Sequence, residues 1–160
     1  MKKPATPTPV FEPEFIAQLK RLFEEKVVFN SVLGLKIDPV EPGVVTGHLD
    51  MRPELVGHYV HNRLHGGVIS AALDGMGGLA AMSSIGARHM DEPLETRLMR
   101  FVKLGTIDLR IDYLRPAVGP RFTARAEVLR LGSRVASVRM EFLDSESRLL
   151  SVGAAAYIVS

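Results

Sequence analysis

The stretch 66–83 constrains the fold most, because it has the composition of a helix that other elements cover on almost every side. Its sequence, "GGVISAALDGMGGLAAMS", is apolar or small throughout and carries one charged residue, Asp74. A helix that is apolar around most of its surface is typical of a protein core. We therefore predict a central helix over residues 66–83, and the rest of the chain must supply the structure that surrounds it.

Segments of alternating polar and apolar residues in the second half of the chain are expected to surround this helix. Polar and apolar residues alternate in 106–114, 121–131 and 134–144, and 149–159 is a small, mostly apolar strand. Period-two patterns separated by short breaks predict antiparallel strands in a meander. In the first of these strands, Ile107 and Leu109 are expected on the apolar face and Thr106 on the opposite one. Together with a strand over 44–51 and a short strand before Pro42, this gives five or six strands.

One long apolar helix and several half-apolar strands predict an α+β fold in which a curved antiparallel sheet wraps around the helix. The length of 160 residues suits one domain, which we place at residues 11–160. Residues 11–29 repeat apolar side chains at helical spacing, and we expect that amphipathic helix to pack on the sheet. The start, "MKKPATPTPV" over residues 1–10, is expected to be a disordered leader rather than a signal peptide.

Composition excludes several classes of protein. The chain has no cysteine, which excludes disulfides, zinc–thiolate sites and thiol catalysis. Its net charge of +2 is too mild to indicate nucleic acid, and its arginines suit a phosphate-bearing small molecule at least as well. No apolar stretch approaches the roughly 20 residues of a membrane helix, so we expect no membrane segment and a soluble, cytoplasmic protein.

Asp74 is the unusual residue of the central helix, because burying a charge is costly. Helical spacing places Ile69, Leu73, Met76 and Ala80 on one stripe, which we expect to face the sheet. Asp74 lies on a second stripe of small residues, namely Ser70, Ala71, Gly77, Gly78 and Ala81. A solvated surface carboxylate, a buried acceptor that holds a loop and a functional group are all consistent with this pattern.

His65-Gly66-Gly67 at the start of the helix favours the functional interpretation. The first amide groups of a helix lack internal partners and carry partial positive charge, so they can polarise a carbonyl and hold an oxyanion. Asp74 would then act as base or nucleophile. It lies seven residues beyond Gly67, about 10 Å along the axis, so both groups reach one carbonyl only if two chains pack helix beside helix, antiparallel.

These residues resemble the PaaI-type hotdog-fold acyl-CoA thioesterases. The shared features are His65-Gly66-Gly67, an acid nine residues after the histidine, and the later motif "YLRPA" at 113–117. "LHGGVISAALD" and "GTIDLRIDYLRP" further resemble the bacterial medium/long-chain acyl-CoA thioesterases of the YigI type. The resemblance implies the hotdog fold, hydrolysis of an acyl-CoA without a cofactor, and a homodimer that pairs again into a tetramer.

The resemblance also implies roles for single positions. The Gly67 N–H would hold the thioester oxygen, Asp74 would act from the partner chain, and His65 would position the loop and the carbonyl. Thr106 would orient the attacking water. Some members carry an asparagine shortly before the histidine; here Asn62 lies at a different offset, and His58 is nearer the matching position.

Several substrate contacts and alternatives remain open. Arg115 and Arg134 are candidates to bind the phosphates of coenzyme A, and Gly66 lets a ligand oxygen approach the helix start. His58, His61 and His65 are better interpreted as neutral loop histidines than as metal ligands. A hotdog hydratase or dehydratase of acyl thioesters and a non-catalytic acyl-CoA sensor are the alternative functions.

Overall fold

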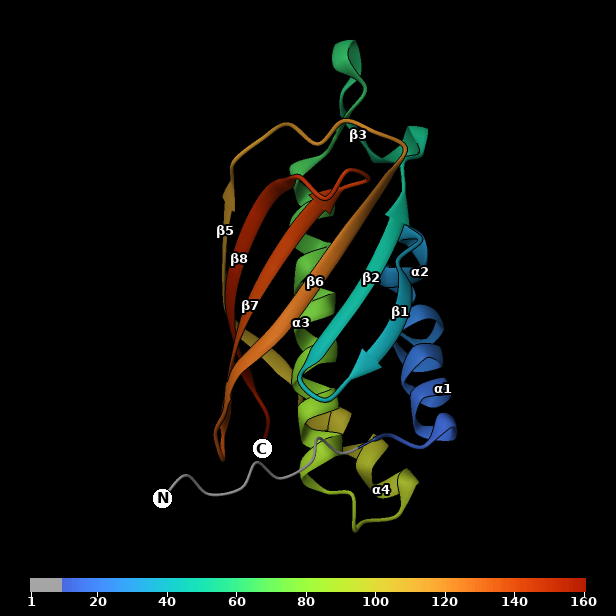
Figure 1. Ribbon diagram of the computed structural model, residues 1–160, viewed down its shortest axis with the longest axis vertical. Helices are drawn as coiled ribbons and strands as arrows, with labels where there is room; N and C mark the ends of the chain where they lie inside the picture. Colours follow the sequence, from blue (N-terminus) through green and yellow to red (C-terminus); the bar gives the residue numbers. More distant parts are fainter. Residues whose placement is uncertain (1–9) are drawn as a thin grey trace.

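A six-stranded antiparallel sheet curves around one long helix in the computed structural model, which describes residues 10–160 (Figure 1). The strands lie in the order β1-β2-β6-β7-β8-β5. Their bounds are Lys36–Glu41 (β1), Val44–Asp50 (β2), Gly105–Tyr113 (β5), Arg121–Leu131 (β6), Val135–Asp144 (β7) and Leu149–Ile158 (β8). The predicted α+β arrangement is confirmed. Of the predicted disordered leader, residues 1–9 lie outside the described residues.

The central helix α3 spans Gly66–Arg88 and runs five residues beyond its predicted end at Ser83. It packs mainly on β6 and β7 and also contacts β2. The stripe predicted to face the sheet is at most 3% exposed at each of its members, Ile69, Leu73, Met76 and Ala80. Gly47 of β2 permits the close approach, since a Cβ there would lie 2.9 Å from the Met76 sulfur.

Helix α3 is long and apolar enough to cross a membrane by length and composition, contrary to our expectation that no stretch is. However, 72% of its most apolar 18-residue window is buried inside the fold, as in the core helix of a globular protein.

The N-terminal segment forms two short helices rather than one helix over 11–29. Helix α1 (Pro13–Arg21) continues into a π-helical turn, Leu22–Lys26, and α2 (Val28–Leu33) follows after a break at Val27. Phe15 of α1 packs against Gly86 of α3, and the guanidinium of Arg97 lies 4.5 Å from the Phe15 ring centroid. The expected packing on the sheet holds only for the π-helical turn, which contacts strand β1, whereas α1 contacts α4 and α2 contacts α3 (Figure 1).

Strand β5 lies beside β8 at the edge of the sheet, so the predicted four-strand meander is wrong at its first strand. Strands β6, β7 and β8 do form a meander, and β6 also pairs with β2. The link 114–120 crosses the ends of the intervening strands (Figure 1). Seven extended residues reach about 23 Å, whereas three steps between strands need about 14 Å. A short connection therefore does not make two strands neighbours.

Two smaller units complete the structure. The predicted loop before α3 contains a protruding hairpin of β3 (Val56–His58) and β4 (Arg63–Leu64), with 3-10 turns at Pro53–Leu55 and Tyr59–His61 (Figure 1). The short helix expected after Pro93 is confirmed as α4 (Leu94–Met99), and a 3-10 turn, Arg100–Lys103, leads from it into β5.

Candidate active site

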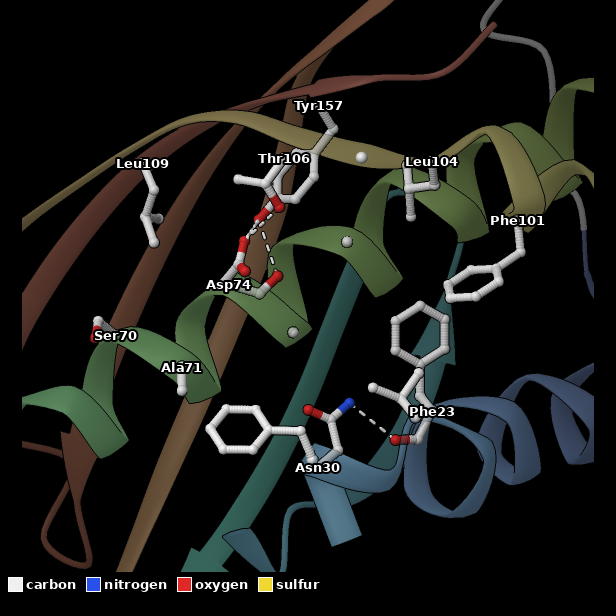
Figure 2. Close-up of a pocket in the computed structure, with 15 residues that line it drawn as sticks. Phe23, Asn30, Ser70, Ala71, Asp74, Phe101, Leu104, Thr106, Leu109 and Tyr157 are labelled. Carbon is white, nitrogen blue, oxygen red and sulfur yellow. Dashed lines mark hydrogen bonds between the residues drawn. The ribbon is translucent and has the colours of Figure 1, made fainter. Parts of the chain in front are cut away.

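The carboxylate of Asp74 accepts hydrogen bonds from two hydroxyl groups on strands of the sheet (Figure 2). The Thr106 hydroxyl donates to Oδ1 at 2.8 Å. The Tyr157 hydroxyl lies 3.2 Å from the same Oδ1 and 2.9 Å from the main-chain oxygen of Asp74. Thr106 of β5 and Tyr157 of β8 are direct partners across the two strands, so one rung of the sheet holds both donors over the helix.

A β-bulge explains why Thr106 points toward the helix. The pairing of β5 with β8 shifts between Thr106 and Asp108, and Ile107 between them is 58% exposed. A bulge reverses the alternation of side chains at that point. The period-two assignment, which placed Ile107 on the inner face and Thr106 on the outer one, is therefore wrong at the start of this strand. The resemblance implied that Thr106 orients the attacking water, and in the structure its hydroxyl donates to Asp74.

Tyr157 is the site residue that sequence reasoning missed. Its side chain is 1% exposed, and burial together with the neighbouring carboxylate raises its pKa, so the hydroxyl stays protonated and acts as a donor. A buried tyrosine hydroxyl normally finds a partner. Two features of the sequence together could have indicated this contact. One is a tyrosine among alanines in 149–159, and the other is a carboxylate in the core helix.

Gly77 makes room for this tyrosine. A Cβ at Gly77 would collide with the Tyr157 hydroxyl and lie 2.8 Å from the Met140 sulfur. Gly77 therefore faces the sheet, whereas we had placed it on a small-residue stripe that faces a second helix. Gly78 and Ala81 of that stripe are also buried within the chain, so only Ser70, Ala71 and Asp74 remain half-exposed.

A pocket of about 460 Å³ opens beside Asp74, and we call it the Asp74 pocket. Its walls are largely apolar and include Phe23, Val27, Phe29, Phe101, Leu104 and Leu109. Figure 2 shows Phe23 on the N-terminal segment, Leu109 on β5, and Phe101 and Leu104 on the segment that leads into β5. Asn30 fixes one wall, because its buried side-chain amide donates to the main-chain oxygen of Phe23 at 2.9 Å. The pocket thus combines one charged group with a surface suited to an alkyl chain.

The start of α3 is capped by its own histidine. The Gly67 N–H donates to Nδ1 of His65 at 2.8 Å, and the Tyr113 hydroxyl donates to the Gly66 oxygen at 2.9 Å. A ligand oxygen can use the Gly67 N–H when the His65 ring turns aside or shares this proton. Gly67 and Asp74 remain about 10 Å apart along the helix axis, so one chain does not bring them to the same carbonyl.

The remaining candidates lie away from the Asp74 pocket in the same chain. His58 and Asn62 are exposed on the protruding hairpin, where the His58 ring stacks on His61 at 4.9 Å. Arg115 donates to the Leu149 oxygen at 2.8 Å and lines a groove beside Gly66. In contrast, Arg134 lies in the β6–β7 turn, near the opposite end of α3, where Arg88 donates to the Gly132 oxygen. One chain therefore does not present both arginines to one phosphate group.

Comparisons with known proteins agree with this geometry. Residues 61–151 match the Thioesterase superfamily, a segment that holds the start of α3, Asp74 and Thr106 and ends before Tyr157. The medium/long-chain acyl-CoA thioesterase YigI of Escherichia coli strain K12 is 37% identical over 138 residues, covering 86% of this chain and 89% of that protein. YigI of Salmonella typhimurium strain LT2 has the same identity and coverage. A crystal structure of a Shewanella oneidensis protein related to the thioesterase superfamily has a TM-score of 0.86 at 37% identity, covering 92% of this chain and 96% of that one.

Proposed function

Because this chain belongs to the Thioesterase superfamily, we propose that it hydrolyses acyl-CoA to a free fatty acid and coenzyme A. Water adds to the thioester carbonyl, the carbon–sulfur bond breaks, and the thiol of coenzyme A leaves with a proton. The observation that carries the proposal is a carboxylate, Asp74, held by two hydroxyls at the side of an apolar pocket. The pocket would take the acyl chain, and its aromatic lining suits medium or long chains, as in the names of the YigI relatives.

Asp74 would supply the base or the nucleophile. Within residues 10–160, both side-chain hydroxyls that reach this carboxylate go to Oδ1, so Oδ2 is the oxygen available to a water molecule or to the carbonyl carbon. As a base, Oδ2 takes a proton from the water that attacks. As a nucleophile, it forms an acyl anhydride that water then hydrolyses. In both routes the Thr106 and Tyr157 hydroxyls fix the direction of attack.

The oxyanion would be held by Gly67 of the partner subunit in a homodimer. Backbone N–H groups at a helix start stabilise the charge that develops on the carbonyl oxygen. Ser70, Ala71 and Asp74 are half-exposed on α3, and their small side chains would let a second α3 approach, antiparallel, so that each dimer has two equal sites. His65 would release the Gly67 N–H as the substrate oxygen arrives.

Asp74→Asn tests the role of the carboxylate. We expect release of free thiol from acyl-CoA to fall by more than the 10²–10³-fold typical of losing one oxyanion donor, about 10³-fold or more. The far-ultraviolet circular dichroism and the melting transition should still report a folded protein. Near wild-type hydrolysis by this variant would refute the proposed mechanism. If the wild-type protein instead hydrates an enoyl-CoA without releasing thiol, the alternative hydratase function is indicated.

Mixing two inactive variants tests the shared site. Gly67→Pro removes the N–H, and proline is tolerated in the first turn of a helix. A mixed dimer of Gly67→Pro and Asp74→Asn subunits contains one site with both native groups. Random mixing should restore about a quarter of the wild-type activity, because half of the dimers are mixed and each has one intact site. If subunit exchange is demonstrated and activity does not recover, the site is not shared. The Gly67 N–H and the Asp74 carboxylate would then act within one chain, or would not form a common site at all.

A further inference from the structure

A second apolar cavity lies directly behind the Asp74 pocket. It has a volume of about 480 Å³ and runs between the N-terminal helical segment and α4. Its lining includes the apolar residues Leu22, Leu98, Met99 and Val102 and the polar residues Gln18, Arg21, Lys26 and Glu95. We call it the α1–α4 groove. Phe101 lines both cavities, so its ring is a partition with the Asp74 pocket on one side and the groove on the other.

Phe23 completes this partition. The rings of Phe23 and Phe101 meet edge to face, with centroids 5.3 Å apart and planes at 76°. Phe23 is 4% exposed and is held in place by the hydrogen bond from Asn30 to its main-chain oxygen. Phe101, in contrast, is partly exposed and sits on the short 3-10 turn after α4. In this wall the Phe23 ring is therefore fixed, whereas the Phe101 ring can be removed with the core left intact.

We propose that the Phe23–Phe101 pair is the end wall of the acyl site and sets the longest chain that fits, with Phe101 as the specificity-determining residue. This inference rests on the proposed acyl-CoA hydrolysis. The alkyl chain of the substrate is the occupant, because both cavities have largely apolar walls and Phe101 lines both of them. In the wild-type protein the chain stops at Phe101, and the groove beyond it is unused.

The wall predicts a definite dependence on chain length. Each methylene that enters an apolar site contributes about 0.8 kcal/mol, which corresponds to about fourfold in kcat/KM. This gain continues until the chain end meets Phe101 and then stops. Phe101→Ala opens the partition, so the gain should continue for several further methylenes, and the longest acyl-CoAs should improve about tenfold to a hundredfold over the wild type. Phe101→Trp extends the wall and should move the limit to shorter chains.

The test is kcat/KM for saturated acyl-CoAs from hexanoyl-CoA to stearoyl-CoA, measured by thiol release below their micelle concentrations. Met99→Glu is the matched control, because Met99 lines the groove but not the Asp74 pocket and is 65% exposed. In the wild-type background it should leave the chain-length profile unchanged. In the Phe101→Ala background it should reduce the gain with long chains, because a carboxylate replaces an apolar wall beside the alkyl chain.

The outcomes separate this inference from the proposed function. A wild-type protein that hydrolyses no acyl-CoA of any length overturns the proposed function and the inference with it. Active wild-type and Phe101→Ala proteins with the same chain-length profile overturn the end wall alone, as does a uniform change at every length. A wild-type profile that responds to Met99→Glu shows that the native chain already enters the groove, and it likewise refutes the wall.

Discussion

Replacing Tyr157 with phenylalanine removes one oxygen atom and tests whether the buried hydroxyl holds the carboxylate of Asp74. The hydroxyl is shared between Oδ1 at 3.2 Å and the main-chain oxygen at 2.9 Å. The ring itself can stay in place, because phenylalanine keeps the shape that packs against Gly77. The substitution therefore isolates the hydrogen bonds from the packing.

Two consequences of Tyr157→Phe can be given magnitudes. A hydrogen bond to a charged group contributes about 1.5–3 kcal/mol, but Asp74 is half-exposed and water can replace part of the lost donor. We therefore expect a loss of about 1–2 kcal/mol in the free energy of unfolding, or about 2–6 °C in Tm for a domain of this size. A carboxylate that is free to rotate is misaligned for attack, and kcat should fall about tenfold to a hundredfold.

Urea denaturation and thiol-release kinetics on the same samples check both numbers. Tyr113→Phe is the matched control for stability, because its hydroxyl donates to the Gly66 oxygen at 2.9 Å but the side chain is 53% exposed. Its free energy of unfolding should change by no more than about 0.5 kcal/mol. A double-mutant cycle with Asp74→Ala, which removes the accepting oxygen, then isolates the bond to Oδ1. Wild-type kcat and Tm in Tyr157→Phe would show that the hydroxyl does not restrain Asp74.

Alkaline pH gives an independent measurement of the same contact. Burial raises the pKa of Tyr157 above the ordinary value of about 10 that the unfolded chain retains. A raised pKa contributes stability that is complete below about pH 10 and is lost as the pH rises further, by about 1.4 kcal/mol per pH unit. Between about pH 10 and pH 11, the free energy of unfolding should therefore fall more steeply in the wild type than in Tyr157→Phe. Parallel curves would contradict the burial of this hydroxyl.

Two further pairs of substitutions test the surroundings of the carboxylate. Gly77→Ala should cost about 1–3 kcal/mol of stability and lower kcat, because the new methyl group displaces Tyr157. The neighbouring Gly78→Ala should instead raise stability by up to about 1 kcal/mol, because its Cβ would meet side chains only at 3.6–3.8 Å. Equal melting temperatures for the Gly77→Ala and Gly78→Ala variants would be inconsistent with this packing. Thr106→Val should lower kcat about tenfold by removing the second donor to Asp74, whereas Thr106→Ser should keep most of the activity. Equal rates for valine and serine would eliminate the Thr106 hydroxyl from the mechanism.

The parts of the fold that follow from local pattern could be predicted from the sequence. The apolar stretch 66–83 gave the central helix and its buried stripe, and the alternation in 121–131 and 134–144 gave two neighbouring strands. Both signals depend on residues close together in the chain. The position of β5 could not be predicted in this way, because the partner of an edge strand is decided by packing between distant segments.

The place of Asp74 and of the glycines at the helix start follows from positions along α3, but the His65 cap on the Gly67 N–H was not predicted. On the sheet, Thr106 was named from the resemblance alone, and Tyr157 was missed. The approach of Thr106 depends on a bulge, which breaks the very alternation that identifies a strand. Tyr157 is 83 residues from Asp74 in the sequence, and only the pairing of β5 with β8 brings both hydroxyls to one place. Helix periodicity contains no information about that pairing.

The contacts of Asp74 favour the functional interpretation among the three that its helix left open. A solvated surface carboxylate would not sit under two hydroxyls from the sheet, one of them on a tyrosine that is 1% exposed. A carboxylate that merely holds a loop would accept main-chain N–H groups from that loop, whereas the groups that reach Asp74 are side chains on two regular strands. These donors offset the cost of partial burial without enclosing the group, because the Asp74 pocket still opens beside it. A core position that served stability alone would be better filled by leucine or alanine. The arrangement keeps a charged oxygen next to an apolar cavity, which is what attack on the carbonyl of an acyl chain requires.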